Sequence, residues 1–253
     1  VETAYMLDDK TGYIKINRFT AKTYTEFMEA LRPMAEEQGL SNLTIDLRGN
    51  PGGYLEEATQ MLSQFFPEGK LLVYTEGRSD TRQEYKSNGR ARFNIQNIAV
   101  LIDEGSASAS EILAGAVQDH DRGWVIGRRS YGKGLVQEEY PLSNQGRLRL
   151  TVARYFTPSG RCIQRVYKNN KNYAKEEMLR LNNGELTDST KVKVLLHFPI
   201  QPIFYWAIVK PQVGSRPHGF LKLIRWVQLS GKNIFLRTNY QQPTIWHGTT
   251  IRL

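Results

Sequence analysis

Apolar and polar positions follow two periods along the first 190 residues. Alternation at every second position predicts strands at 14–16, 43–47 and 148–152, and short apolar runs predict buried strands at 71–74, 98–102 and 124–126. Apolar residues three or four positions apart predict helices at 27–39, 55–65, 109–120 and 173–181. This rhythm of strand, helix and strand predicts an α/β fold with a mostly parallel sheet.

Short residue patterns predict where some helices begin and where the chain turns. Thr23 stands three residues before Glu26, which is the spacing of a capping box and predicts a helix start. Asn50-Pro51-Gly52-Gly53 interrupts the chain between a strand and a helix. The polar segment 76–97 is expected to form a loop or a hairpin. The single cysteine, Cys162, excludes an internal disulfide framework.

The net charge of +9 changes this picture only at the carboxyl-terminal end. The last acidic residue is Asp188, and nine basic residues follow it, so that residues 1–188 hold 25 basic and 25 acidic residues. Three of the four tryptophans also lie beyond residue 190. We therefore expect a core at 1–190 and an atypical, irregular basic tail at 191–253.

The segment from Gly105 to Glu111 leads from the end of a predicted buried strand into a helix. Backbone N–H groups at a helix start lack partners and favour negative charge, so a serine there could have its oxyanion stabilised. Serines before a helix are most often caps, and Ser106 and Ser110 keep that interpretation. The Gly-x-Ser-x-Gly elbow of the α/β-hydrolases is absent.

Two side chains are candidates for the base that would activate Ser108. His120 lies between Asp119 and Asp121, but residues adjacent on a helix point to different faces, so a solvated helix end is favoured over a triad. Lys133 lies between Gly132 and Gly134, and burial of a lysine favours the neutral form that a base requires. A loop cation is the alternative, since the phosphate-loop pattern is not met.

Four motifs in order make residues 12–164 resemble the catalytic core of the C-terminal processing peptidases, also called tail-specific proteases. They are Asp46-Leu47-Arg48-Gly49-Asn50-Pro51-Gly52-Gly53, Gly105-Ser106-Ala107-Ser108-Ala109-Ser110-Glu111-Ile112, the segment Gly127–Gln137 around Gly132-Lys133-Gly134, and the segment Leu150–Arg161. The resemblance implies a crotonase-like or ClpP-like βαβ spiral.

The resemblance also implies roles for individual residues. Ser108 would be the nucleophile, Lys133 the general base, and Gln137 the residue that positions Lys133. The oxyanion would be held by Gly53 or Gly52 together with Ala109, and Asp119 matches a position with a supporting role. The implied reaction is hydrolysis of a polypeptide near its carboxyl end through an acyl-enzyme, with no metal or other cofactor.

The same family implies a setting and partners. Its members act mostly outside the cytoplasm, for example in the periplasm, and bind the substrate as an added β-strand. They usually carry a PDZ domain before the core, for which Val1–Tyr13 leaves no room, so none is expected within this chain. No transmembrane segment is expected, because no run of about 18 apolar residues occurs.

The tail keeps two further hypotheses open. The abrupt loss of acidic residues suggests that the sequence beyond about residue 192 comes from a shifted reading frame. The alternative is that this segment is a genuine extension of the protein. A basic, aromatic tail could bind nucleic acid or an anionic membrane surface, but nucleic-acid binding is not expected because residues 1–188 carry no net charge. The alternative to an active peptidase is a catalytically impaired fragment that binds peptide without cleaving it.

Overall fold

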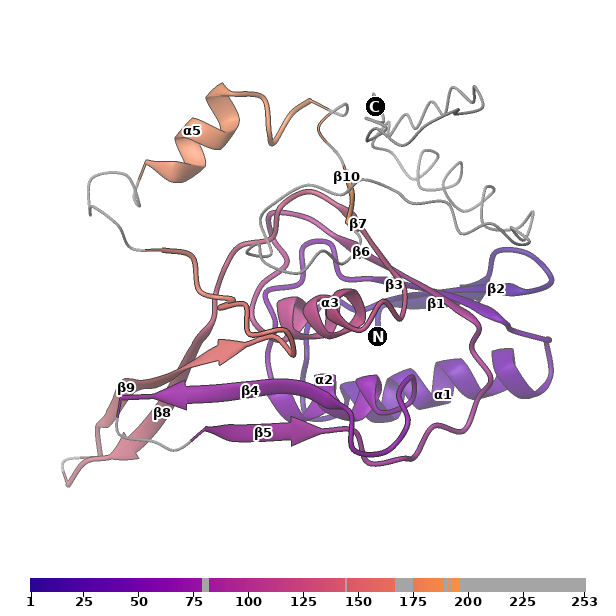
Figure 1. The fold of residues 1–253 in the computed structure, drawn as a ribbon, viewed down its shortest axis with the longest axis horizontal. Coiled ribbons are helices and arrows are strands. Elements are labelled where there is room, and N and C mark those ends of the chain that lie inside the picture. Colours follow the sequence, from indigo (N-terminus) through magenta and orange to yellow (C-terminus); the bar gives the residue numbers. More distant parts are fainter. Residues whose placement is uncertain (79–81, 144, 167–174, 189–190, 192, 196–253) are drawn as a thin grey trace, which may run out of the picture.

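The computed structural model describes residues 1–78, 82–143, 145–166, 175–188, 191 and 193–195. Within these residues the chain forms two sheets with helices packed on and between them (Figure 1). The α/β fold class is therefore confirmed. The predicted tail falls almost wholly outside the described residues.

The larger sheet has the strand order β1-β2-β3-β6-β7-β10. Its strands are β1 (Thr3–Met6), β2 (Thr11–Lys15), β3 (Asn42–Asp46), β6 (Asn97–Ile102), β7 (Trp124–Gly127) and β10 (Lys193–Leu195). The pairings from β2 through β3 and β6 to β7 are parallel, whereas β1 and β10 pair antiparallel at the two edges. A parallel centre was predicted, and all five residues of β3 are buried, as expected for a strand covered on both faces.

The smaller sheet is antiparallel throughout and has the order β5-β4-β9-β8. It is made of β4 (Leu71–Gly77), β5 (Gln83–Lys86), β8 (Leu135–Pro141) and β9 (Arg147–Phe156). The segment 76–97 thus contains one arm of a hairpin, as expected. β8 was not predicted, because its residues are largely exposed and carry no apolar alternation.

Helix α3 (Ala109–Asp119) joins the two sheets, because it packs on β7 of one and β4 of the other. Helix α1 (Thr23–Glu36) packs on β1 and β2, and α2 (Leu55–Leu62) packs on both α1 and α3. The last described helix, α5 (Glu176–Asn182), lies away from this core in Figure 1. The main apolar core is shared by β2, β3, β6 and these three inner helices.

The capping box predicted at Thr23 is wrong. Thr23 lies inside α1, and its hydroxyl oxygen accepts the Thr20 N–H at 2.8 Å and donates to the Arg18 carbonyl, so it closes the preceding turn. The helix itself starts where predicted, because its buried face is set by Phe27, Leu31 and Met34 and not by the cap.

Candidate active site

Ser108 occupies the N-cap position of α3 in a strained backbone conformation. Its φ of 54° and ψ of −114° lie outside the regions that residues with a side chain favour. The surrounding contacts hold it there: the Ala107 N–H donates to the Asn50 carbonyl at 2.9 Å, and the Ser108 N–H donates to Glu111 Oε2 at 2.8 Å. The half-buried Ser108 therefore lies at a helix start whose N–H groups favour negative charge.

The two neighbouring serines fasten this segment to the strand β3 and the turn after it. Ser106 Oγ donates to the Leu47 carbonyl at 2.7 Å, and Ser110 Oγ donates to the Asn50 carbonyl at 3.0 Å. Neither hydroxyl caps α3, so the interpretation of Ser106 and Ser110 as helix caps is wrong. Both serines are fully buried, which leaves Ser108 as the accessible hydroxyl of the three.

The turn from Asn50 to Gly53 lies directly against Ser108. A Cβ added to Gly52 would approach the Ala107 carbonyl oxygen to 2.5 Å and the Ser108 Cβ to 2.7 Å, so only glycine fits there. The Gly52 N–H already donates to Asn50 Oδ1 at 2.8 Å. Among the described residues, the N–H groups of Gly53 and Ala109 have no hydrogen-bond acceptor, and these are the donors free to bind an oxyanion.

A buried ion pair supports the start of this turn. Arg48 binds the carboxylate of Asp46 through Nε and an Nη, and the Tyr13 hydroxyl donates to Asp46 Oδ2 at 2.6 Å. Burial alone would raise the pKa of Asp46, but the bonds from Arg48 and Tyr13 outweigh it and hold that pKa below its usual value. Asp46 is therefore ionised and fixes the backbone that leads to Gly52.

The loop that carries Lys133 is tied to the nucleophile segment through Glu111. One carboxylate oxygen of Glu111, Oε2, accepts both the Ser108 N–H and the Lys133 N–H at 2.8 Å each. The other, Oε1, accepts the Ser130 hydroxyl at 2.6 Å and the Gly132 N–H at 2.5 Å. The backbone nitrogens of Ser108 and Lys133 therefore lie within twice the 2.8 Å bond length of each other.

Glu111 is the site residue that sequence reasoning missed. Its side chain is buried, and burial raises its pKa, while the four donors act in the opposite direction. The signal was present: Ser108 and Glu111 have the Ser-x-x-Glu spacing of a capping box, the same pattern that was misassigned at Thr23. Here the glutamate reaches back to the N-cap N–H and also bridges to a second loop.

The glycines around Lys133 allow this loop to pass close to a third segment. A Cβ on Gly134 would lie 2.3 Å from the Gln164 backbone nitrogen, and the Gly134 N–H donates to Gln164 Oε1 at 3.0 Å. On the other side, the Arg165 N–H donates to the Gly132 carbonyl at 3.1 Å. The glycines on both sides of Lys133 thus let this loop lie against the 164–165 backbone.

The side chains of Lys133 and Gln137 are both exposed. Within the described part of the chain neither makes a hydrogen bond, and no hydrogen bond joins Lys133 Nζ to Ser108 Oγ. Gln137 lies on β8 opposite Thr151, beside a register shift between Val136 and Gln137. The structure thus brings the backbones of Ser108 and Lys133 together, but no hydrogen bond joins their side chains in the described part of the chain. The burial expected for Lys133 is not provided by these residues.

Asp119 and His120 lie at the opposite end of α3 from Ser108. Eleven or twelve residues at 1.5 Å per residue separate them by about 16–18 Å, so neither reaches the serine. His120 Nε2 contacts the Leu71 carbonyl oxygen at 2.6 Å, which excludes the triad. Asp119 forms an ion pair with Arg161 and accepts the N–H and hydroxyl of Ser159, and these contacts hold the 157–161 turn.

Among the described residues, no group of three or more His, Cys, Asp or Glu side chains is placed to hold a metal ion. No helix in the described ranges is long and apolar enough to cross a membrane.

The structure describes an α/β protein with a strained, half-buried serine at a helix start, and the comparisons place the chain in a family. The model of peptidase family S41 matches residues 10–170. The chain belongs to that family.

Individual relatives match the same region. The chain is 39% identical over 168 residues to the carboxyl-terminal-processing protease of Synechocystis sp., and 40% identical over 173 residues to the carboxy-terminal-processing protease of Bartonella bacilliformis. Each alignment covers 64% of this chain but only 39% and 38% of the relative. The chain thus spans about two fifths of the length of these curated relatives.

Solved structures agree with these relatives. The photosystem II D1 C-terminal processing protease is 34% identical, with a TM-score of 0.57 over 61% of this chain and 39% of that one. A putative S41 protease from Bacteroides fragilis, at 18% identity, has a TM-score of 0.53 over 74% of this chain and 57% of that one, and shows the fold alone.

Proposed function

We propose that this protein is a serine-type endopeptidase that cleaves polypeptides near their carboxyl end, with Ser108 as nucleophile and Lys133 as general base. The observation that carries the proposal is the shared carboxylate oxygen of Glu111, which binds the backbone N–H groups of both residues at 2.8 Å. A lysine loop fastened to a strained serine is what a two-residue catalytic unit requires. The relatives named as C-terminal processing proteases support the substrate class.

The proposed reaction proceeds in two steps. Neutral Lys133 accepts the proton of Ser108 Oγ as that oxygen bonds to the scissile carbonyl carbon, and the resulting oxyanion accepts hydrogen bonds from the Gly53 and Ala109 N–H groups. Lys133 then gives its proton to the leaving amine as the peptide bond breaks and an ester of Ser108 forms. A water molecule, deprotonated by Lys133, hydrolyses the ester and restores the serine.

Formation of the complete site would require the Lys133 side chain and the start of β8 to move. The exposed side chain of Lys133 has to turn toward Ser108 and lose water, and a bound peptide would cover it. Gln137 would then orient the amine, four residues further along on β8. Because Glu111 fixes the loop backbone, only the side chain and the adjoining start of β8 need to move.

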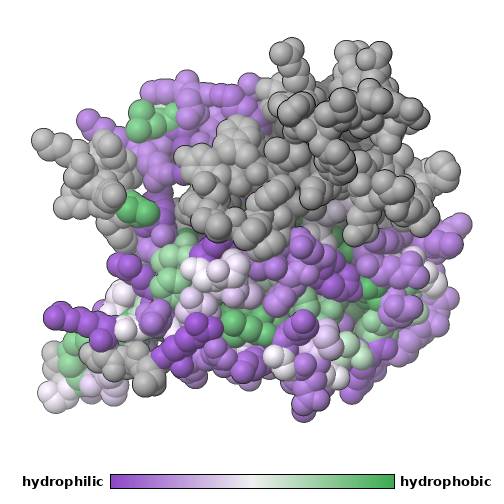
Figure 2. Space-filling model, in the orientation of Figure 1, coloured by the Kyte–Doolittle hydropathy of each residue, from purple (hydrophilic) through white to green (hydrophobic). Residues whose placement is uncertain are grey.

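The substrate would add as a strand to the free edge of β8. In the described part of the smaller sheet, β8 is an outer strand, and it begins two residues after Lys133. Figure 2 shows a small green area among white and purple atoms at the lower left, where the β8–β9 hairpin protrudes in Figure 1. The exposed apolar residues of this hairpin are Tyr140, Leu142, Leu148 and Leu150. An extended peptide would gain main-chain hydrogen bonds there and cover part of this surface.

Membership of the family supports two further proposals, one on the type of fold and one on the cellular location. We propose that the two-sheet core is a crotonase-like or ClpP-like spiral, supported by its parallel centre and by α3 between the sheets. We also propose an extracytoplasmic, for example periplasmic, location, supported by the class of the named relatives.

A second candidate function is peptide binding without cleavage. It is favoured by one observation: Lys133 Nζ forms no hydrogen bond with Ser108 Oγ among the described residues. In that case the β8 edge would still bind an extended peptide, but the serine would not be activated.

Cleavage of an unstructured protein substrate separates the two functions. The peptidase proposal expects Ser108→Ala and Lys133→Ala to abolish cleavage, and Lys133→Arg to be inactive as well because arginine does not lose its proton. Lys10→Ala, which also removes one exposed lysine, is the matched control and should keep full activity. An unchanged rate in Lys133→Ala would refute the Ser–Lys pair, and binding without turnover in the unmodified chain would favour the second function.

A further inference from the structure

A pocket of roughly 590 Å³ lies between α1 and the segment that follows β5, and none of its lining residues belongs to the segments around Ser108. Three arginines line it together with an apolar floor. The residues that matter here are Tyr24, Met28, Glu29, Arg32, Arg90 and Arg92. The volume lies within the range of sites for small organic ligands.

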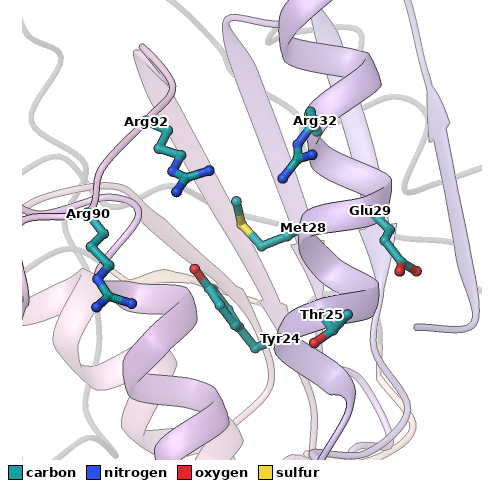
Figure 3. A pocket seen from close by; sticks show the side chains of 7 residues that line it. All are labelled: Tyr24, Thr25, Met28, Glu29, Arg32, Arg90 and Arg92. Carbon is teal, nitrogen blue, oxygen red and sulfur yellow. The ribbon is translucent and has the colours of Figure 1, made fainter.

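The three guanidinium groups have no ion-pair partner among the described residues. Figure 3 shows Arg32 and Arg92 directed toward each other on either side of Met28, while Glu29, the acidic residue of the lining, points away. Three like charges around one space repel each other, and a bound anion would relieve that repulsion. Guanidinium groups bind oxyanions through paired N–H donors.

The floor of the pocket adds a neutral donor and an apolar surface. Met28 is buried, and the Tyr24 ring lies beside it in Figure 3. The Tyr24 hydroxyl oxygen accepts a hydrogen bond from Gln64 Nε2 at 2.9 Å, and a hydroxyl that accepts one bond can still donate another. Gln64 is itself buried.

We propose that this pocket binds an organic carboxylate. The carboxylate group would lie between Arg32 and Arg92, with Arg90 and the Tyr24 hydroxyl as further donors, and the hydrocarbon part would rest on Met28 and the Tyr24 ring. The apolar floor distinguishes this ligand from inorganic phosphate, which would gain nothing from it. The carboxylate could belong to an acidic side chain or terminus of a polypeptide, or to a free small molecule.

Isothermal titration of this chain with three probes tests the proposal and its source. The probes are a short capped peptide with Leu next to Glu, the free dicarboxylate glutarate, and inorganic phosphate. Saturable binding of the peptide alone assigns the site to polypeptide carboxylates, and binding of glutarate as well assigns it to carboxylates of either source. Phosphate binding more tightly than both carboxylate probes would overturn the proposal, as would no saturable binding of either carboxylate.

Charge-matched variants locate the binding. Arg32→Gln and Arg92→Gln should each weaken carboxylate binding by about threefold to tenfold, as expected for one charge-assisted contact at a partly exposed site. Arg32→Lys should weaken it less, because the charge remains while the paired donors are lost. Lys22→Gln removes a positive charge just before α1 and outside the pocket, and an equal loss in this control would show nonspecific attraction and overturn the proposal. All three side chains, Arg32, Arg92 and Lys22, are exposed, so folding should persist, and circular dichroism checks it.

Discussion

Replacing Glu111 by glutamine tests whether one buried carboxylate joins the two halves of the site. The carboxylate accepts four hydrogen bonds, two at each oxygen. A glutamine amide keeps the shape but replaces one acceptor oxygen by an NH₂ group, so two of the four donors would face another donor.

The expected loss of stability follows from those two bonds. Hydrogen bonds to a charged group contribute about 1.5–3 kcal/mol each, which gives roughly 3–6 kcal/mol for two. Burying a neutral amide costs less than burying a carboxylate, and this offsets part of the loss. We expect the free energy of unfolding to fall by about 2–4 kcal/mol, a large part of the total of a domain.

Urea unfolding and peptide cleavage measure the two consequences separately. Glu111→Gln should lower the unfolding free energy as above and reduce cleavage by about 100-fold, because the lysine loop loses its fixed distance from Ser108. Ser130→Ala removes one donor and leaves the other three, so it should cost only about 1 kcal/mol. If Glu111→Gln unfolds within 0.5 kcal/mol of the parent, roughly the spread of neutral surface changes, the reasoning is refuted.

The pH dependence gives an independent check on the same residue. Burial raises the pKa of Glu111, so the folded protein binds this proton more tightly than the unfolded chain. The pH-dependent part of this group's contribution to stability is therefore present below the unfolded pKa, about 4.3, and is lost as the pH rises through the higher folded value, while the four hydrogen bonds limit that loss. The bonds to Ser108 and Lys133 need the ionised form, so cleavage should fall on acidification through that value. This acid limb should be absent in Glu111→Gln.

Three further changes probe the same framework. Gly52→Ala should abolish cleavage and lower the melting temperature, because the added Cβ meets the Ala107 oxygen at 2.5 Å and the φ of 91° is strained; normal activity would contradict the tight turn. Ser108→Gly should abolish cleavage but stabilise the fold by about 1 kcal/mol in urea, since glycine relieves the backbone strain, and a less stable variant would show that no strain is stored. Asp119→Asn should cost about 2–4 kcal/mol, because it weakens a buried ion pair with Arg161. The bonds from Arg161 and Ser159 outweigh burial and lower the pKa of Asp119. In the parent protein this carboxylate should therefore stabilise the fold above pH about 4, and the stabilisation should disappear as the pH falls through the folded pKa of Asp119.

The sequence by itself determined the elements whose apolar period is regular and whose ends are marked. The buried faces of α1 and α3 and the strands β3 and β6 could be read directly, because burial dictates which positions are apolar. The order of four motifs also located Ser108 and Lys133 in a family core, which the match over residues 10–170 confirms. β8 could not be read, because an exposed strand has no buried face to impose a pattern.

The tertiary structure alone decided how the motifs meet. Ser106 and Ser110 resemble caps in sequence, yet they fasten the helix start to β3 and its turn, because the carbonyls of Leu47 and Asn50 lie opposite them only after the sheet forms. The choice between Gly52 and Gly53 as an oxyanion donor depends on Asn50 Oδ1, which takes the Gly52 N–H. The link from Ser108 to Lys133 through Glu111 spans more than twenty residues, and no local pattern encodes it, since a carboxylate finds its distant donors only once both loops are folded.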